Sequence, residues 1–351
     1  MKKLVCKSAF YNIEIDHLGN VYPCCPSYSN FRKIGNITLP EINSIEEIFY
    51  SPEAIELRKR ILNNDYSLCD MKYCRQRELV EIEEENAFST IPKYLNLAYD
   101  CECNIRCVYC RDEYYKNDEE KISYYNEQIL PKLMPFLLKV EHLKLDGIGE
   151  ALASKHTRTL IKMVAEKNDK VVFDLLTNGL VFNEANIESL GLKGRLGDVG
   201  ISIHSLTRDT YEKIMRGSHF DTVIKNIKNA SKLVKQGYIK RIILLVVISD
   251  MNYKEIPKFI DFAKKYGLSV SFSVYLKWGA KLDNDYEQHE VWNPKHKNYK
   301  DLKAVLKKTI NKGYSKAWFS PALLKVADCS TQSYVVEKPS LWSKITKILK
   351  K

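Results

Sequence analysis

Short apolar runs alternate with helix-like segments through most of this 351-residue chain, and this alternation constrains its fold more than any other feature. From residue 94 to residue 275, six runs have the length and composition of strands, with helix-like segments between them. Repeated strand–helix units predict parallel strands joined by crossover helices, which is an α/β fold. The expected strands are Tyr94–Tyr99, His142–Asp146, Val171–Leu176, Asp198–Ile203, Ile242–Ile248 and Ser269–Tyr275, and the expected helices are Tyr124–Leu138, Lys155–Glu166, Glu184–Leu190, Asp209–Met215, Asp221–Gln236 and Tyr253–Tyr266.

Six strand–helix units are fewer than the eight of a closed barrel, so we expect a partial (β/α)6 TIM barrel. The turns that follow the first four strands are rich in glycine, cysteine and polar residues. They are the segment 101–110, Gly147-Ile148-Gly149-Glu150, Thr177-Asn178-Gly179, and Ser202 with His204. Because the carboxyl ends of parallel strands meet at one rim, where barrel enzymes carry out their chemistry, these turns predict a single site.

Three cysteines after the first strand, Cys103, Cys107 and Cys110, have the spacing C-x3-C-x2-C. Three thiolates can hold three irons of a [4Fe–4S] cluster, which leaves the fourth iron open to a small molecule. Ten cysteines in a chain without a recognisable secretory signal argue against a disulfide framework and favour cluster or metal ligation. The alternative is zinc or a structural cluster with Cys101 as fourth ligand, but C-x-C spacing crowds one face of a cubane, so we place Cys101 outside the ligand set.

With Tyr109 before its third cysteine, and with the GIGE and TNG turns behind it, the triplet resembles the radical S-adenosylmethionine (SAM) superfamily. The resemblance spans residues 92–278. It implies that SAM binds the open iron and that one electron cleaves it to a 5′-deoxyadenosyl radical, which abstracts hydrogen from a substrate. A reduced flavodoxin or ferredoxin is the electron donor that it implies.

The resemblance also implies roles for the second turn. Glu150 would accept a hydrogen bond from the SAM amino group, and Gly147 and Gly149 would let the backbone approach the cofactor. A polar turn without a ligand is the alternative interpretation. Ala151 stands where the family usually has proline.

Further SAM contacts are implied at the rim. Ser202 would lie near the SAM carboxylate or ribose, Arg216 would pair with the carboxylate, and Tyr109 would pack near adenine. A surface ion pair is the alternative for Arg216. Asn178 and His204 are expected to face the same rim, with a structural hydrogen bond the alternative for His204.

The amino-terminal segment carries a second cysteine pattern. Cys6-x12-Gly19-x4-Cys24, followed by Cys69-x4-Cys74, resembles the auxiliary-cluster domains called SPASM and TWITCH. The implied ligands of one auxiliary [4Fe–4S] cluster are Cys6, Cys24, Cys69 and Cys74, with zinc as the alternative. Neighbouring strand residues face opposite ways, so only one of Cys24 and Cys25 can easily ligate this cluster, and spacing favours Cys24.

Three domains are expected: an auxiliary domain with its connector at 1–88, the radical SAM core at 89–280, and an extension at 281–351. In the first, residues 10–26 predict two strands that turn at Leu18-Gly19-Asn20, residues 44–74 predict helices, and the acidic stretch 79–86 predicts a helical connector. In the extension, Tyr299–Asn311 predicts a helix and Cys329 a buried small hydrophobic residue.

The formal net charge of +11 comes without a basic stripe of interleaved aromatic residues, which disfavours nucleic acid as a partner. A basic surface equally suits an acidic electron donor. The end of the chain, Leu341–Lys351, is amphipathic, and docking on the protein is preferred over binding to an anionic membrane. The missing secretory signal and the lack of a long apolar run predict a cytoplasmic protein.

The sequence therefore predicts a radical SAM enzyme, with a peptide or protein as the first choice of substrate. A sugar or other small metabolite is the second choice. Two further hypotheses are an iron–sulfur binding or electron-transfer protein without SAM cleavage, and an enzyme that modifies RNA.

Overall fold

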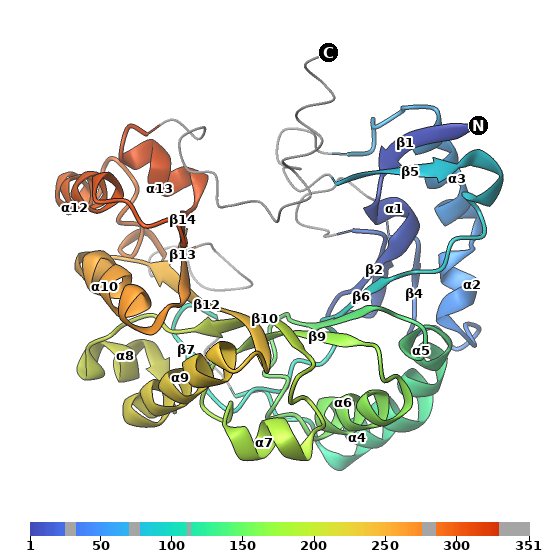
Figure 1. The fold of residues 1–351 in the computed structure, drawn as a ribbon, viewed down its shortest axis with the longest axis horizontal. Coiled ribbons are helices and arrows are strands. Elements are labelled where there is room, and N and C mark those ends of the chain that lie inside the picture. The colour runs from blue at the N-terminus through green and yellow to red at the C-terminus, as the bar shows by residue number, and fades with distance from the viewer. Residues whose placement is uncertain (25–32, 70–77, 111–113, 276–285, 330–351) are drawn as a thin grey trace. The chain divides into compact units, whose positions relative to one another are not determined.

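The computed structural model describes residues 1–24, 33–69, 78–110, 114–275 and 286–329 (Figure 1). These residues form two compact units. Unit 1 comprises residues 1–104, 115–176 and 185–197, and unit 2 comprises residues 105–114, 177–184 and those from 198 onward. The domain boundaries expected after residues 88 and 280 stay a prediction.

The larger group of paired strands in unit 1 has the order β9-β8-β6-β2-β3-β4. Its strands are β2 (Asn12–Ile15), β3 (Asn20–Tyr22), β4 (Gly35–Asn36), β6 (Tyr94–Leu97), β8 (His142–Leu145) and β9 (Val172–Thr177). The pairs β2–β6, β6–β8 and β8–β9 are parallel, and β3 and β4 continue the sheet in antiparallel fashion. The amino-terminal hairpin thus extends the core sheet at β6, which sequence reasoning did not predict.

The hairpin β2–β3 forms where the sequence predicts it. The carboxylate of Asp16 accepts hydrogen bonds from the backbone N–H groups of Leu18 and Asn20, both at 2.9 Å. Gly19 has a φ of +75°, a conformation that glycine adopts without a steric penalty. The aspartate and the glycine together reverse the chain between the two strands.

The acidic stretch after residue 78 is a strand, so the predicted helical connector is wrong. Strand β5 (Leu79–Glu83) pairs antiparallel with β1 (Lys2–Cys6), and only a short 3-10 turn, η2 (Glu84–Asn86), follows it. Glu83 stands opposite Lys2 of β1, and ion pairs join Lys2 to Glu81 at 3.9 Å and Lys3 to Glu84 at 2.9 Å. These cross-strand charges stabilise a pairing that the sequence of residues 79–86 alone does not reveal.

One face of the unit 1 sheet is apolar and packs against helices (Figure 1). Its residues are at most 6% exposed: Ile13, Ile15, Leu95, Leu97, Leu143, Leu145, Phe173 and Leu175. The helices of unit 1 are α1 (Ser8–Tyr11), α2 (Ile45–Phe49), α3 (Pro52–Leu62), α4 (Glu119–Tyr124), η3 (Tyr125–Ile129, a π-helical turn), α5 (Leu130–Leu137), α6 (Lys155–Lys167) and α7 (Glu184–Ser189). Serine side chains cap the amino-terminal ends of α2, α3 and α6.

Unit 2 contains four strands in the order β14-β13-β12-β10. They are β10 (Leu196–Ser202), β12 (Ile239–Ile248), β13 (Ser269–Val274) and β14 (Ala317–Phe319), with β12–β13 and β13–β14 parallel. A separate two-stranded ladder pairs β7 (Arg106–Cys107) with β11 (Met215–Arg216). The helices are α8 (Arg208–Ile214), α9 (Phe220–Lys235), η4 (Tyr253–Glu255), α10 (Ile256–Tyr266), α12 (Tyr299–Asn311) and α13 (Pro321–Val326).

The predicted α/β class is confirmed, because all six expected strands form and are mostly parallel. No pairing among the described strands closes a barrel, as expected for a partial one. Cys329, which was expected to be a buried small hydrophobic residue, is half-buried, and its thiol donates to the Ala327 carbonyl. None of the helices in the described ranges is both long and apolar enough to cross a membrane. The tail Leu341–Lys351 lies outside the described residues.

Candidate functional site

In unit 1, the segment that leads from β6 to Cys103 is fixed by the side chain of Asp100. Its carboxylate accepts hydrogen bonds from the Glu102 backbone N–H at 3.0 Å, the Asn117 amide at 2.9 Å and the Thr157 hydroxyl at 2.7 Å. The Cys103 backbone N–H donates to the carbonyl of Tyr115 at 2.8 Å. Sequence reasoning missed Asp100, although an acidic residue directly after a strand was a visible signal.

The turn after β8 lies against this same segment. The Glu150 N–H donates to the Glu102 carbonyl at 2.7 Å, and a Cβ added at Gly149 would lie 2.2 Å from the Asp100 carbonyl oxygen. Gly147 has a φ of +125°, and a Cβ there would lie 2.8 Å from the Ala98 side chain. Both glycines are thus needed for a close backbone approach. Glu150 is only 2% exposed. Their contact with SAM stays a prediction.

Cys107 and Cys110 lie in unit 2. Cys107 stands opposite Met215 in the β7–β11 ladder, and the Cys110 N–H donates to the Cys107 carbonyl at 3.1 Å. Arg216 stands opposite Arg106, and its Nε donates to the Arg106 carbonyl at 3.3 Å. The ladder therefore fixes the predicted carboxylate-binding arginine directly beside the cysteine segment.

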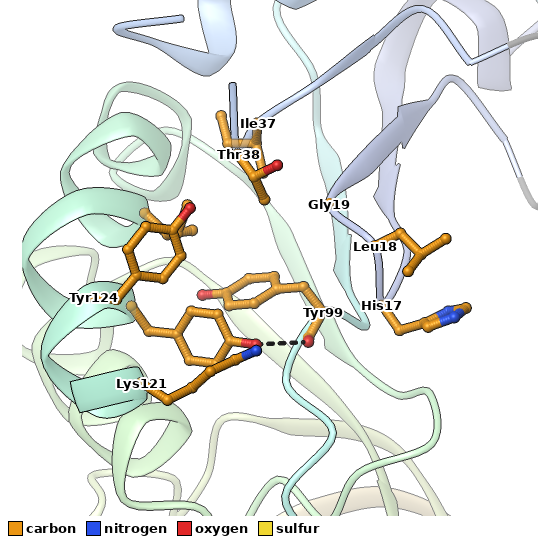
Figure 2. A pocket seen from close by; sticks show the side chains of 10 residues that line it. His17, Leu18, Gly19, Ile37, Thr38, Tyr99, Lys121 and Tyr124 are labelled. Atoms are coloured by element: carbon orange, nitrogen blue, oxygen red, sulfur yellow. Dashed lines mark hydrogen bonds between the residues drawn. The ribbon is translucent and has the colours of Figure 1, made fainter. Parts of the chain in front are cut away.

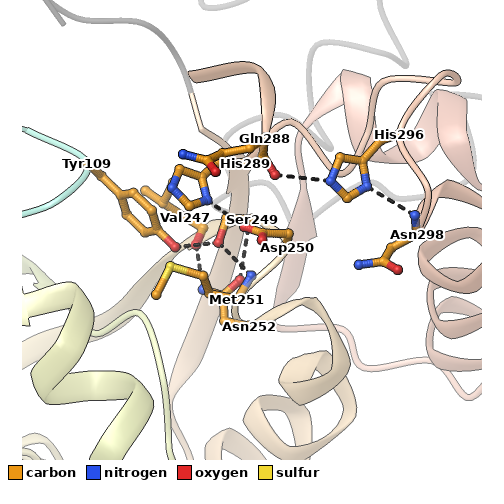
Figure 3. Close-up of polar contacts among 10 residues, drawn as sticks. All are labelled: Tyr109, Val247, Ser249, Asp250, Met251, Asn252, Gln288, His289, His296 and Asn298. Carbon is orange, nitrogen blue, oxygen red and sulfur yellow. Dashed lines mark hydrogen bonds and ion pairs between the residues drawn. The ribbon is translucent and has the colours of Figure 1, made fainter. Parts of the chain in front are cut away.

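Tyr109 anchors the cysteine segment of unit 2 to the end of β12 (Figure 3). Its side chain is 6% exposed and its hydroxyl forms a hydrogen bond with the hydroxyl of Ser249. The ring centroid of Tyr109 lies 5.4 Å from that of His204 and 4.9 Å from that of Tyr275. The predicted packing of this ring near adenine stays a prediction.

The loop after β12 is itself held rigid. The Asn252 amide donates to the carbonyls of His204 at 2.6 Å and Val247 at 2.7 Å, and its oxygen accepts from the Ser249 N–H at 2.9 Å (Figure 3). Asp250 follows Ser249 and forms an ion pair of 2.6 Å with Nδ1 of His289. Sequence reasoning missed these residues, because the stretch Ser249–Asn252 reads as an ordinary turn.

The remaining predicted rim residues of unit 2 occupy strand ends. Ser202 is the last residue of β10, and Asn178 is 6% exposed, with its side-chain oxygen accepting from the Leu180 N–H at 3.0 Å. Burial lowers the pKa of His204 to about 4, and its Nδ1 accepts from the Val247 N–H at 3.3 Å. His204 is therefore neutral near pH 7 and has a structural hydrogen bond, which was the alternative interpretation.

The side chains of the triplet fit a cluster. Cys103, Cys107 and Cys110 are partly exposed, as ligands of an inserted cluster must be, and thiolate is the donor that iron–sulfur clusters use. Within the described ranges, no three His, Cys, Asp or Glu side chains converge as they would around a single metal ion. A cluster has separate irons, so its thiolates need not converge on one point.

Two of the described auxiliary cysteines, Cys6 and Cys24, lie at or close after the end of a strand. Cys6 is the last residue of β1 and stands opposite Leu79, Cys24 follows β3, and the Cys69 N–H donates to the Tyr66 carbonyl at 2.9 Å. All three side chains are partly exposed. Cys74 and Cys25 lie outside the described residues, so the four-ligand set and the choice of Cys24 stay predictions.

Unit 1 also contains a cavity of about 170 Å³ that sequence reasoning did not predict (Figure 2). The hairpin turn contributes His17, Leu18 and Gly19 to its wall, and the aromatic part consists of Tyr99, Tyr124 and Tyr125. Behind this wall the Tyr99 hydroxyl donates to Nε2 of His156 at 2.6 Å. Its lining is mainly aromatic and aliphatic, and we assign it no ligand.

Comparisons with known proteins agree with both cysteine patterns. The profile of the radical SAM superfamily matches residues 101–263, and that of SPASM, an iron–sulfur cluster-binding domain, matches residues 6–76. A GTP 3′,8-cyclase of Clostridium botulinum is 30% identical over 181 residues, which are 51% of this chain and 55% of that protein. A GTP 3′,8-cyclase of Synechocystis is 28% identical over 189 residues, 53% of this chain and 54% of that protein.

The chain spans about half the length of these curated relatives. Among solved structures, one titled native anSMEcpe with bound AdoMet has 17% identity and a TM-score of 0.41, and the alignment covers 62% of this chain and 59% of that one. The two profile matches confirm the predicted class of enzyme and its cofactors, a SAM-binding [4Fe–4S] cluster, SAM and an auxiliary iron–sulfur site, at the level of the family. Residues 101–263 therefore form a domain of the radical SAM superfamily, and residues 6–76 form an iron–sulfur cluster-binding domain of the SPASM family.

Proposed function

We propose that the chain cleaves SAM reductively to a 5′-deoxyadenosyl radical and uses it to abstract hydrogen from a small-molecule substrate. One observation carries this proposal. The turn Gly147–Glu150 is joined through its backbone to the segment before Cys103, by the 2.7 Å hydrogen bond between Glu150 and Glu102. The stretches that the family resemblance assigns to SAM and to the cluster are therefore one rigid part of unit 1.

The chain's own residues would bind and orient the cofactors. When bound, the cluster and SAM supply the electron and the reactive radical, which no side chain can supply. Cys103, Cys107 and Cys110 would provide thiolates, and the buried carboxylate of Glu150 would accept a hydrogen bond from an ammonium group. Arg216, held on the Arg106 backbone, would provide a cation for a carboxylate.

A small molecule is preferred over a peptide, although the sequence alone ranked a peptide or protein first. The relatives from Clostridium botulinum and Synechocystis are both named GTP 3′,8-cyclase, and GTP is a small molecule. This supports the second choice made from the sequence, a sugar or other small metabolite. For the electron donor, the net charge of +11 supports an acidic protein such as a reduced flavodoxin or ferredoxin.

The first experiment measures SAM cleavage. The full chain is reconstituted anaerobically with iron and sulfide and reduced with dithionite, and 5′-deoxyadenosine is quantified by chromatography. We expect 5′-deoxyadenosine from the native chain and none from Cys103→Ala. Cys329→Ala is the matched control, since this cysteine lies far along the chain from both patterns, and it should retain cleavage. Intact clusters without 5′-deoxyadenosine would instead support the electron-transfer alternative.

A second experiment separates the two substrate classes. The reconstituted enzyme is incubated with deuterated cell extract that has been divided into a small-metabolite fraction and a peptide fraction. Deuterium abstracted from the substrate appears in 5′-deoxyadenosine and is detected by mass spectrometry. We expect label from the metabolite fraction, and label from the peptide fraction alone would contradict the small-molecule proposal.

A further inference from the structure

The face of the unit 1 sheet opposite the helices is polar, which is unusual for parallel strands. Such strands are normally apolar on both faces because both are covered. Here the register aligns Glu14, Asn96, Lys144 and Asp174 across β2, β6, β8 and β9. Apart from Asn96 these side chains are half-buried or exposed, whereas their neighbours on the other face are buried. A polar, incompletely covered face is suited to a polar ligand.

Two amide oxygens on this face lack a hydrogen-bond donor. The side-chain oxygen of Asn96 is buried without a partner in a residue that is only 9% exposed. The side-chain oxygen of Asn12, two residues before Glu14 on β2, is also buried and unpartnered. Because an unsatisfied buried acceptor is costly, these atoms call for a donor that the residues described in the structure do not supply.

The charges of the face point to the kind of donor. The ammonium of Lys144 pairs with the carboxylate of Asp146, and His142 lies 3.4 Å from a carboxylate oxygen of Asp174. The carboxylate of Glu14 accepts a side-chain hydrogen bond from Asn96 and is attracted by the charge of Lys144, but these two interactions do not offset its burial and the repulsion from Asp146. Burial, and then the charge of Asp146, raise the pKa of Glu14 above its usual range. An added cation beside Glu14 would oppose both effects, because it would stabilise the charged form of the carboxylate.

We propose that Glu14 and Asn96 bind an ammonium group, with adjacent hydroxyls, of the small-molecule substrate, so that the auxiliary domain contributes directly to substrate recognition. The proposal rests on the proposed function, because it deepens the choice of a small-molecule substrate. β6 leads into the segment that runs through Ala98 and Asp100 to Cys103, so a substrate on this face would lie along the strand that leads toward the first cysteine of the triplet. Asn12 and Asn96 offer acceptors and the ammonium of Lys144 on this face is already paired with Asp146, which disfavours a phosphate-bearing substrate.

The experiment measures binding rather than turnover, so it gives an answer whether or not SAM is cleaved. Ligand-observed NMR on the reconstituted full chain compares three probes: glucosamine, which has an ammonium and hydroxyls, N-acetylglucosamine, in which the charge is removed, and GTP. We expect glucosamine to bind about tenfold more tightly than N-acetylglucosamine, because a charge-assisted hydrogen bond is lost in the latter. GTP should bind more weakly than glucosamine.

The matched variants are Glu14→Gln, which keeps the shape of the side chain, and Glu81→Gln, which removes a carboxylate exposed to 69% on β5. We expect Glu14→Gln to weaken glucosamine binding about tenfold and Glu81→Gln to leave it unchanged. Equal binding of the two sugars, tighter binding of GTP, absent glucosamine binding, or an unaffected Glu14→Gln variant would each overturn the proposal. Absent 5′-deoxyadenosine with intact glucosamine binding would overturn only the proposed function.

Discussion

Glu14 and Asn96 stand opposite each other in the parallel pair β2–β6, so a carboxylate of the iron–sulfur domain shares a sheet face with an amide of the strand that leads to Cys103. The auxiliary domain therefore contributes strands to the core sheet and is not a separate appended module. Its apolar residues should then contribute to the stability of the core, and its polar residues to the environment of the substrate.

Ile13 tests whether the two parts unfold together. It is 1% exposed and stands opposite Leu95 of β6, so Ile13→Ala leaves a cavity inside the shared sheet. We expect a loss of about 2–5 kcal/mol in the free energy of unfolding, measured with urea. Hydrogen exchange should accelerate in both β2 and β6. Leu18→Ala, at a residue 62% exposed, is the control and should change neither. Faster exchange confined to β2 would argue against a shared sheet.

Arg58 should be irreplaceable by lysine. It is 1% exposed, and its guanidinium donates to the carbonyls of Ala9 at 3.0 Å and Phe49 at 2.8 Å and lies 4.0 Å from the Phe49 ring centroid. Burial lowers its pKa to about 10. Lysine lacks the planar fork, so Arg58→Lys should cost about 2 kcal/mol of stability in urea unfolding. Arg60→Lys on the same helix, half-exposed, should be near neutral. Equal costs would contradict this assignment.

Much of the core could be predicted because its signals are local. Apolar runs bounded by turns identify the parallel strands, and the periodicity of Tyr299–Asn311 predicts that helix with its observed bounds. The pairing of β2 with β6 could not be predicted. The residues Asn12–Ile15 alternate in polarity, and a strand of this kind can pair with any exposed strand edge. Strand β5 was missed because its glutamates are neutralised only by lysines far away in the sequence.

The residues of the site could be predicted where they belong to a sequence motif. They could not be predicted where tertiary contacts alone determine their role. The cysteine spacing identified Cys103, and the GIGE turn identified Gly149. In unit 1 the structure places Gly149 against the segment that leads to Cys103. Asp100 and Ser249 have no motif. Their importance follows from the segments that they fix, and these partners are distant in sequence.

Gly149 tests the contact between the turn and the cysteine segment. A Cβ at this residue would lie 2.2 Å from the Asp100 carbonyl oxygen, so Gly149→Ala must displace backbone. We expect at least about a tenfold loss in the rate of 5′-deoxyadenosine formation, because small displacements of reacting groups are costly. Gly237→Ala, where φ is +79° and a Cβ would meet nothing within 4 Å, is the control for backbone strain without a clash and should keep the native rate. A native rate in Gly149→Ala would show that the contact has no role.

His156 should make the protein sensitive to mild acid. It is fully buried, its Nε2 accepts from Tyr99 and its Nδ1 contacts the Asn126 oxygen at 2.7 Å, and burial lowers its pKa to about 4 from an ordinary 6.5. Above pH 6.5 both the folded and unfolded forms are neutral. Between pH 6.5 and 4 only the unfolded chain takes up the proton, so stability falls as the pH falls.

The size of this effect follows from the same pKa difference. From pH 6.5 to pH 5 a single such histidine costs about 2 kcal/mol of unfolding free energy. We expect His156→Gln to reduce the pH dependence by about this amount, whatever the variant does to stability at neutral pH. The measurement is the difference between urea unfolding free energies at pH 7 and pH 5, for the native chain and the variant. His142→Gln, half-exposed on the polar face of β8, is the control and should retain the full difference. An unchanged difference in His156→Gln would mean that folding does not lower the pKa of this histidine, which would contradict the assignment.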